Sequence, residues 1–129
     1  MNWQPISEQV WDGIRAEFTL PAVGQVHQRL SELMEDPEPV MQQLVRVFID
    51  EGTYCPGFQF LPGGQIHPTV RELFTRAMAL QIPHNCFAAW MVTASRTLSG
   101  SRPVDLLKGR PSSLFLALET LVHRGSVAV

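Results

Sequence analysis

The sequence predicts a mainly α-helical fold, a compact bundle of about seven short helices with one small β-hairpin. Apolar residues recur three and four positions apart along most of the chain, which is the pattern of helices that bury one face. Proline recurs where such runs begin, and the first turn of a helix tolerates proline because its missing N–H would have no partner there. The prolines that open predicted helices are Pro21, Pro37, Pro68, Pro83, Pro103 and Pro111.

The chain has 129 residues, of which 45% are hydrophobic and 17% are charged. This size and composition suit one core, so we interpret residues 1–129 as a single domain. No apolar run reaches the roughly 18 residues that favour a membrane span, and we expect no secretory leader. We therefore expect a cytoplasmic protein without membrane contact, in which Cys55 and Cys86 are reduced, buried thiols.

The acidic N-terminal part, residues 1–53, predicts three helices. Apolar spacing defines the first helix, Pro21 opens the second, and the Asp36-Pro37 pair caps the third. Their predicted ranges are 7–18, 21–34 and 37–51, with a stop at Gly52.

After Tyr54, apolar and polar residues alternate, and the apolar residues no longer recur at helical spacing. Phe58-Gln59-Phe60 alternates, Pro62-Gly63-Gly64 has the composition of a turn, and Gln65-Ile66-His67 returns, so we predict a hairpin. Because a lone hairpin is marginal in water, Phe58 and Phe60 should pack against helices. Four further helices are predicted at 68–78, 82–93, 103–108 and 111–124, and residues 125–129 form a tail.

The stretch from Trp90 to Leu107, called the corner below, combines a helix end, a turn and a helix start. Gly100 can adopt a positive φ without penalty and redirect the chain, and Pro103 then opens the next helix. Two short helices must therefore pack around one tight turn. The residues expected to form its architecture are Trp90, Leu98, Gly100, Pro103, Leu106 and Leu107.

Side chains that bind metals or act as nucleophiles match no established pattern in this sequence. The metal candidates lack paired C-x-x-C or H-x-x-x-H spacing, so we predict no metal and no cofactor. They are Cys55, His67, His84 and Cys86. The candidate nucleophiles are turn-forming serines without a G-x-S-x-G elbow, so we predict that the protein is not an enzyme. They are Ser95, Ser99 and Ser101.

Charge is distributed unevenly, although the formal net charge is only -2. Residues 1–60 hold nine Asp and Glu against three Lys and Arg, whereas residues 87–129 hold two against five. The acidic half repels phosphate backbones, which argues against DNA binding by an N-terminal helix-turn-helix. The basic side chains at the corner either bind carboxylate or phosphate groups or only solvate the surface. They are Arg96, Arg102, Lys108 and Arg110.

Two groups of motifs occur in the C-terminal half. The first is Tyr54-x-Pro56-x-Phe58-Gln59-Phe60 with Gly64-x-Ile66-x-Pro68, and the second is Trp90-Met91-x-Thr93 with Leu98-x-Gly100-x-Arg102-Pro103-Val104-Asp105-Leu106-Leu107. In order and approximate spacing they resemble the toxin-binding domain of the Xre/MbcA/ParS antitoxins, over residues 54–124. The chain departs from that family at Thr93-Ala94-Ser95, where the family has Thr-Pro-Asn, and in its acidic N-terminal helices, which do not match the family's helix-turn-helix.

The resemblance implies a non-enzymatic, mostly helical domain that binds a partner toxin, typically a RES-type toxin that consumes NAD, and occludes its active site. It also implies self-association, so a homo-oligomer is expected. The residues that we expect to contact the partner are Arg96, Arg102, Arg110 and Arg124. The alternatives are a DNA-binding transcriptional regulator that uses the basic corner, and a stand-alone relative that binds another protein.

Overall fold

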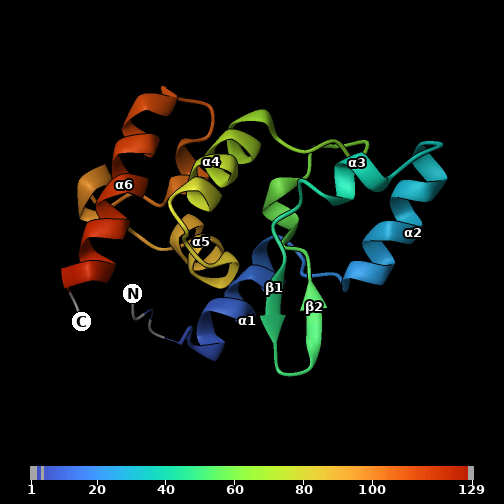
Figure 1. Cartoon of the computed structure of the whole chain (residues 1–129), viewed down its shortest axis with the longest axis horizontal. Coiled ribbons are helices and arrows are strands. Elements are labelled where there is room, and N and C mark those ends of the chain that lie inside the picture. The colour runs from blue at the N-terminus through green and yellow to red at the C-terminus, as the bar shows by residue number, and fades with distance from the viewer. Residues whose placement is uncertain (1–2, 4, 128–129) are drawn as a thin grey trace.

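The computed structural model describes residues 3 and 5–127, and it describes the side chains of the last helix as far as Val122. This part of the chain forms six α-helices, two strands and three 3-10 turns, which confirms a mainly α-helical fold with one small hairpin (Figure 1). In chain order the elements are α1 (Glu8–Glu17), α2 (Val23–Leu33), α3 (Glu38–Met41), β1 (Val47–Ile49), β2 (Gly52–Tyr54), η1 (Gly57–Gln59), α4 (Pro68–Ala79), α5 (His84–Met91), η2 (Arg96–Leu98), η3 (Pro103–Leu106) and α6 (Pro111–Val127).

Most of the predicted helix starts are confirmed. Pro68 and Pro111 are the first residues of α4 and α6, and His67 caps α4 because its Nδ1 accepts the Thr69 N–H at 3.2 Å. The predicted helix at 103–108 is the 3-10 turn η3, and α6 continues past the predicted stop at Gly125 to Val127. A helical glycine costs only about 1 kcal/mol relative to alanine, so Gly125 does not by itself end the helix.

The predicted helix over residues 37–51 is wrong beyond Met41. Residues Val47–Ile49 form β1 instead, and their exposed fractions of 0%, 58% and 6% alternate as in a strand. β1 pairs antiparallel with β2, with Val47 opposite Tyr54 and Ile49 opposite Gly52. The helical spacing of apolar residues is overridden here because side chains from distant segments bind the backbone N–H groups on which a helix would depend.

Gln59 is the most buried of these side chains, with an exposed fraction of 0%. Its Oε1 accepts the Val45 N–H at 2.8 Å, and its Nε2 donates to the Val45 carbonyl at 3.1 Å and to the Pro56 carbonyl at 3.0 Å. The amide therefore pairs with the backbone of Val45 in both directions, as a neighbouring strand would. A buried amide is stable only when hydrogen-bonded, and Gln59 meets this requirement.

The N-terminal turn of α5 closes the edge of β1 that faces away from β2. The His84 Nδ1 accepts the Arg46 N–H at 3.1 Å. The Asn85 amide accepts the Phe48 N–H at 2.8 Å and donates to the Phe48 carbonyl at 2.9 Å. An open strand edge invites pairing with other chains, and these two side chains occupy it.

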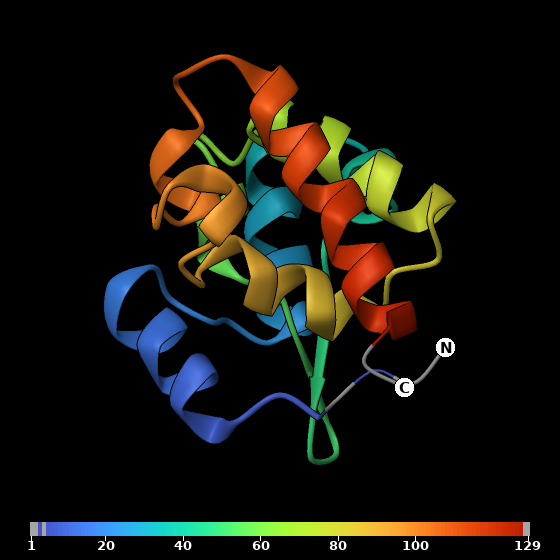
Figure 2. The same cartoon turned by 90° about the vertical axis from the view of Figure 1, so that its left-hand side faces the viewer.

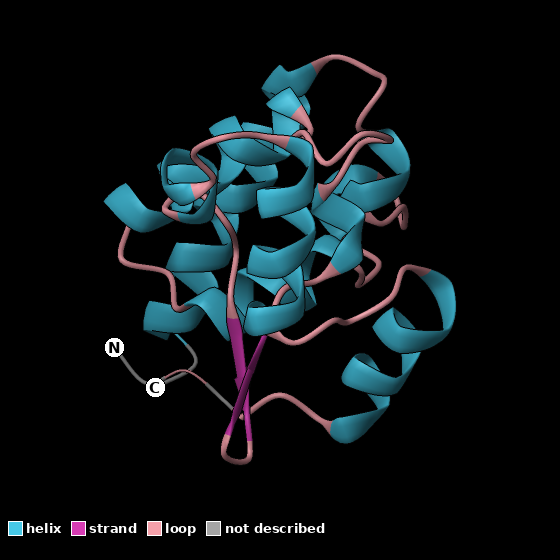
Figure 3. Cartoon of the chain, turned by 90° about the vertical axis from the view of Figure 1, so that its right-hand side faces the viewer, coloured by secondary structure: helices cyan, strands magenta, loops and turns pink. Residues whose placement is uncertain are grey.

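The hairpin predicted around Pro62-Gly63-Gly64 is in the wrong place. Phe58 and Gln59 belong to the 3-10 turn η1, and the two-stranded sheet, magenta in Figure 3, is formed by β1 and β2, which lie earlier in the chain. The chain does turn back on itself here, because Phe60 and Ile66 form a single antiparallel bridge. Gly63 and Gly64, with φ of 92° and 85°, make the turn between them, and their conformations favour glycine.

Two hydrophobic clusters form the core. The larger lies among α1, β1, α4, α5, η2 and α6, and the smaller joins α2, α3 and Cys55. Figure 1 shows α2 and α3 at one end of the long axis and α6 at the other, with the hairpin between. Phe58 packs in the larger cluster and Phe60 against the smaller one, so both phenylalanines contact helical clusters with Gln59 between them. No described helix is long and apolar enough to cross a bilayer.

We predict that Gln59→Leu lowers the free energy of unfolding by about 2–4 kcal/mol, because the buried Val45 N–H and C=O would both lose their partner. Urea denaturation measures this loss. The matched control is Gln43→Leu, which makes the same change at an exposed position and should alter stability little. Equal stabilities for the two variants would contradict the role assigned to Gln59.

Candidate functional site

The backbone of the corner is a closed loop between α5 and α6. The Ser95 N–H donates to the Ser101 carbonyl at 3.0 Å, and the Gly100 N–H donates to the Ser95 carbonyl at 2.8 Å. Ser99 and Gly100 have φ of 57° and 86°, so the positive φ expected for Gly100 is confirmed. The three serines considered as nucleophiles take part in this turn, and Figure 2 shows residues 96–110, drawn in orange, along one side of the molecule next to α6.

Apolar residues anchor the corner in the larger cluster. Trp90 and Leu98 are each only 7% exposed, and Pro103 is buried at the start of η3. Leu106 and Leu107 are half-buried and pack against the same cluster. The residues expected to form the architecture of the corner are therefore packed or, for Gly100, placed in the turn.

Arg102 joins the corner to α1. Its Nη1 and Nη2 donate to the two carboxylate oxygens of Glu17, each at 2.8 Å. Its Nε and Nη2 donate to Asp105 at 2.8 Å and 2.9 Å. These four hydrogen bonds use four of the five guanidinium N–H groups, in the bidentate geometry that suits arginine and carboxylate. Partner binding by Arg102 stays a prediction, and the structure gives this side chain an intramolecular role.

The same contacts set the charge states of the three groups. The hydrogen bonds from Arg102 lower the pKa of both Glu17 and Asp105 below their ordinary values. The hydrogen bonds from Glu17 and then Asp105 raise the pKa of Arg102. All three groups are therefore charged at neutral pH, and the network carries one positive and two negative charges.

The other basic residues near the corner are exposed. Within the described part of the chain, Arg96, Lys108 and Arg110 make no ion pair with a carboxylate. The side chain of Arg124 lies outside the described residues. Arg102 is thus paired within the molecule, whereas the other three cations are open to solvent.

The side chains considered as metal ligands lie in separate environments. No three described His, Cys, Asp or Glu side chains are placed to hold a metal ion. Cys55 is buried, and burial raises its pKa to about 11, which keeps the thiol protonated and unreactive. His67 caps α4, and His84 accepts the Arg46 N–H just before β1. Cys86 is only half-buried, so the expectation of a buried thiol is wrong for that residue.

Sequence reasoning missed the side chains that bind Arg102 and the edge of β1. Glu17 is separated from Arg102 by 85 positions, and Asn85 from Phe48 by 37, so no local pattern relates them. Arg46 was also missed. Its Nη2 donates to the Met41 carbonyl at 2.6 Å, while its buried Nε has no partner among the described residues.

A scan of protein-family models, a search of curated proteins and a search of solved structures each give no match to this chain. The relation to the antitoxin family therefore stays a prediction from the motifs.

We predict that Arg102→Gln lowers the thermal midpoint of unfolding at low ionic strength, because α1 loses its ion pair to the corner. Salt screens such surface interactions, so the difference from wild type should shrink as ionic strength rises. Arg96→Gln is the matched control, with no described ion pair to lose. Identical melting of both variants at low salt would show that the pairing of Arg102 does not stabilise the fold.

His84 gives a second prediction, for stability against pH. Burial, and then the charge of Arg46, lower the pKa of His84 below its ordinary value, so the folded protein favours the neutral ring. The unfolded chain takes up the proton first, with a pKa near 6.5. The stabilisation is therefore fully present above about pH 6.5 and is lost as pH falls toward the lower folded pKa.

Urea midpoints measured at about pH 7 and pH 5 test this. We expect His84→Asn, which keeps an acceptor for the Arg46 N–H and does not titrate, to reduce the loss of stability over this range. Glu17 has a lowered pKa and an ordinary value of 4.5, so its contribution is lost only at more acidic pH. An unchanged pH slope in the variant would contradict the assignment to His84.

Proposed function

We propose that the chain is a non-enzymatic, antitoxin-like interaction domain that binds a partner toxin through the corner and occludes its active site. The observation that carries the proposal is the contrast between a fixed corner and the free cations beside it. Arg96 and Arg110 are exposed and make no ion pair within the described residues. Cations of this kind suit carboxylates on a partner protein.

The packing of the corner supports this proposal. Leu98 and Pro103 are buried, and Arg102 ties the turn to α1, so binding would order little additional backbone. A preorganised surface loses less entropy on association than a mobile one. Apolar contact is also available, because Leu116 in α6 is 62% exposed. We therefore expect the arginines to fix the position of the partner on the corner and exposed apolar side chains to supply part of the affinity.

The direct test is to look for a RES-type toxin gene beside the gene for this chain and, if one is found, to co-express the two proteins. We expect the chain to restore growth and to preserve cellular NAD. The double variant Arg96→Glu/Arg110→Glu should weaken binding to the purified toxin by at least about tenfold, because it places like charges at the interface. Titration calorimetry measures this change.

The matched control is Arg71→Glu, the same reversal at an exposed arginine of α4 without a described ion pair. It should bind like the wild type. Stable, soluble wild-type protein that fails to restore growth would exclude the antitoxin function. Equal affinities for the double variant and the control would exclude the corner as the binding surface.

A further inference from the structure

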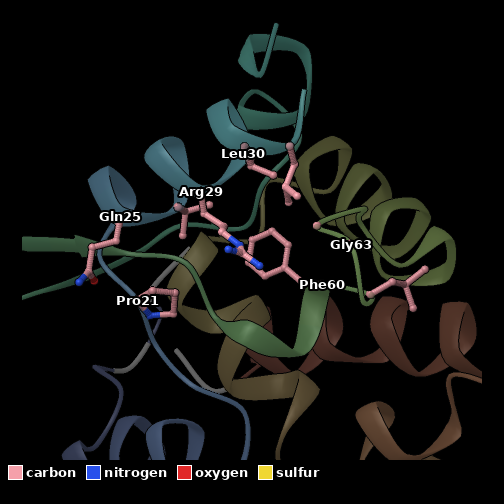
Figure 4. Close-up of a pocket in the computed structure, with 10 residues that line it drawn as sticks. Pro21, Gln25, Arg29, Leu30, Phe60 and Gly63 are labelled. Carbon is pink, nitrogen blue, oxygen red and sulfur yellow. The ribbon is translucent and has the colours of Figure 1, made fainter. Parts of the chain in front are cut away.

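A pocket of about 330 Å³ opens beside α2, at the smaller hydrophobic cluster (Figure 4). One wall is α2, which contributes Val26, Leu30 and Leu33, and the other carries Phe60 and Gly64. No residue of the corner lines it. Its volume is at the low end of the roughly 300–1,000 Å³ of small-molecule sites.

The walls of the pocket are apolar and close together. Leu33 lines the pocket and is 44% exposed, so it presents apolar surface at the mouth. A Cβ added to Gly64 would lie 2.8 Å from the Leu33 Cδ1, so the turn approaches α2 as closely as a glycine permits. The pocket thus offers apolar surface to an occupant with a short hydrocarbon portion.

Among the polar groups at the rim, Arg29 presents hydrogen-bond donors. The Gln25 Oε1 accepts the Ala22 N–H at 3.0 Å, and its amide points away from Arg29 and Phe60 (Figure 4). Arg29 projects from α2 toward the wall that carries Phe60 (Figure 4). Its Nη1 forms an ion pair with the Glu32 Oε2 at 3.8 Å, which is beyond hydrogen-bonding distance, so the guanidinium keeps its N–H donors for another acceptor. A cation beside apolar walls is complementary to a carboxylate with an apolar tail.

We propose that this pocket binds a small monocarboxylate with a medium-length apolar tail. The tail packs between Leu30, Leu33 and Phe60, and the carboxylate accepts hydrogen bonds from Arg29. The site is independent of the corner, so it stands or falls separately from the antitoxin function.

Octanoate is the probe, and octanamide is its uncharged analogue. We expect octanoate to cause saturable amide shifts in NMR spectra of the full chain, centred on α2 and residues 60–64. Binding should weaken about tenfold for octanamide and for Arg29→Gln, because a hydrogen bond to a charged group is lost. The matched control Arg71→Gln, at an exposed arginine of α4, should keep the wild-type affinity.

Leu33→Ser provides a second test at a half-exposed residue whose replacement leaves the buried cluster intact. It should weaken octanoate binding at least several-fold by removing apolar contact. No saturable shift, shifts centred elsewhere, equal affinities for octanoate and octanamide, or an Arg29→Gln variant that binds like wild type would each overturn the proposal.

Discussion

The fold depends on the hydrogen bonds between the buried amide of Gln59 and the backbone of Val45. They hold η1 against the segment that leads into β1, at the point where the two hydrophobic clusters meet. Phe58 on one side and Phe60 on the other bring the same short segment into both clusters. A buried amide costs free energy unless its partners are in place, so it also excludes other registers of this segment.

Side chains repeatedly take the place of a neighbouring strand. Gln59 pairs with Val45, and His84 and Asn85 occupy the outer edge of β1. A two-stranded sheet alone is marginal in water, and these contacts attach it to helices at several points. The same contacts explain why β1 is not a helix, since its backbone N–H groups are bound from outside.

Local patterns predict local structure in this chain. Pro68 and Pro111 mark helix starts because the missing N–H and the fixed φ act within one turn, and Gly100 has the positive φ that its position requires. The strand at Val47–Ile49 depends on side chains from η1 and α5, which no window of neighbouring residues contains. At the corner, composition indicated basic side chains, and only the fold shows that Arg102 is paired while Arg96 makes no ion pair with any described residue.

The pairing of Arg102 with Glu17 also affects which residues an isolated fragment must contain and when the corner forms during folding. The predicted resemblance to the antitoxin family covers residues 54–124, yet a fragment of that range would lack Glu17 and the buried Trp11 and Ile14 of α1. The corner is therefore completed by a helix that lies 85 positions earlier in the chain. Closing so long a loop costs entropy before the contact forms, so the corner should be assembled late in folding.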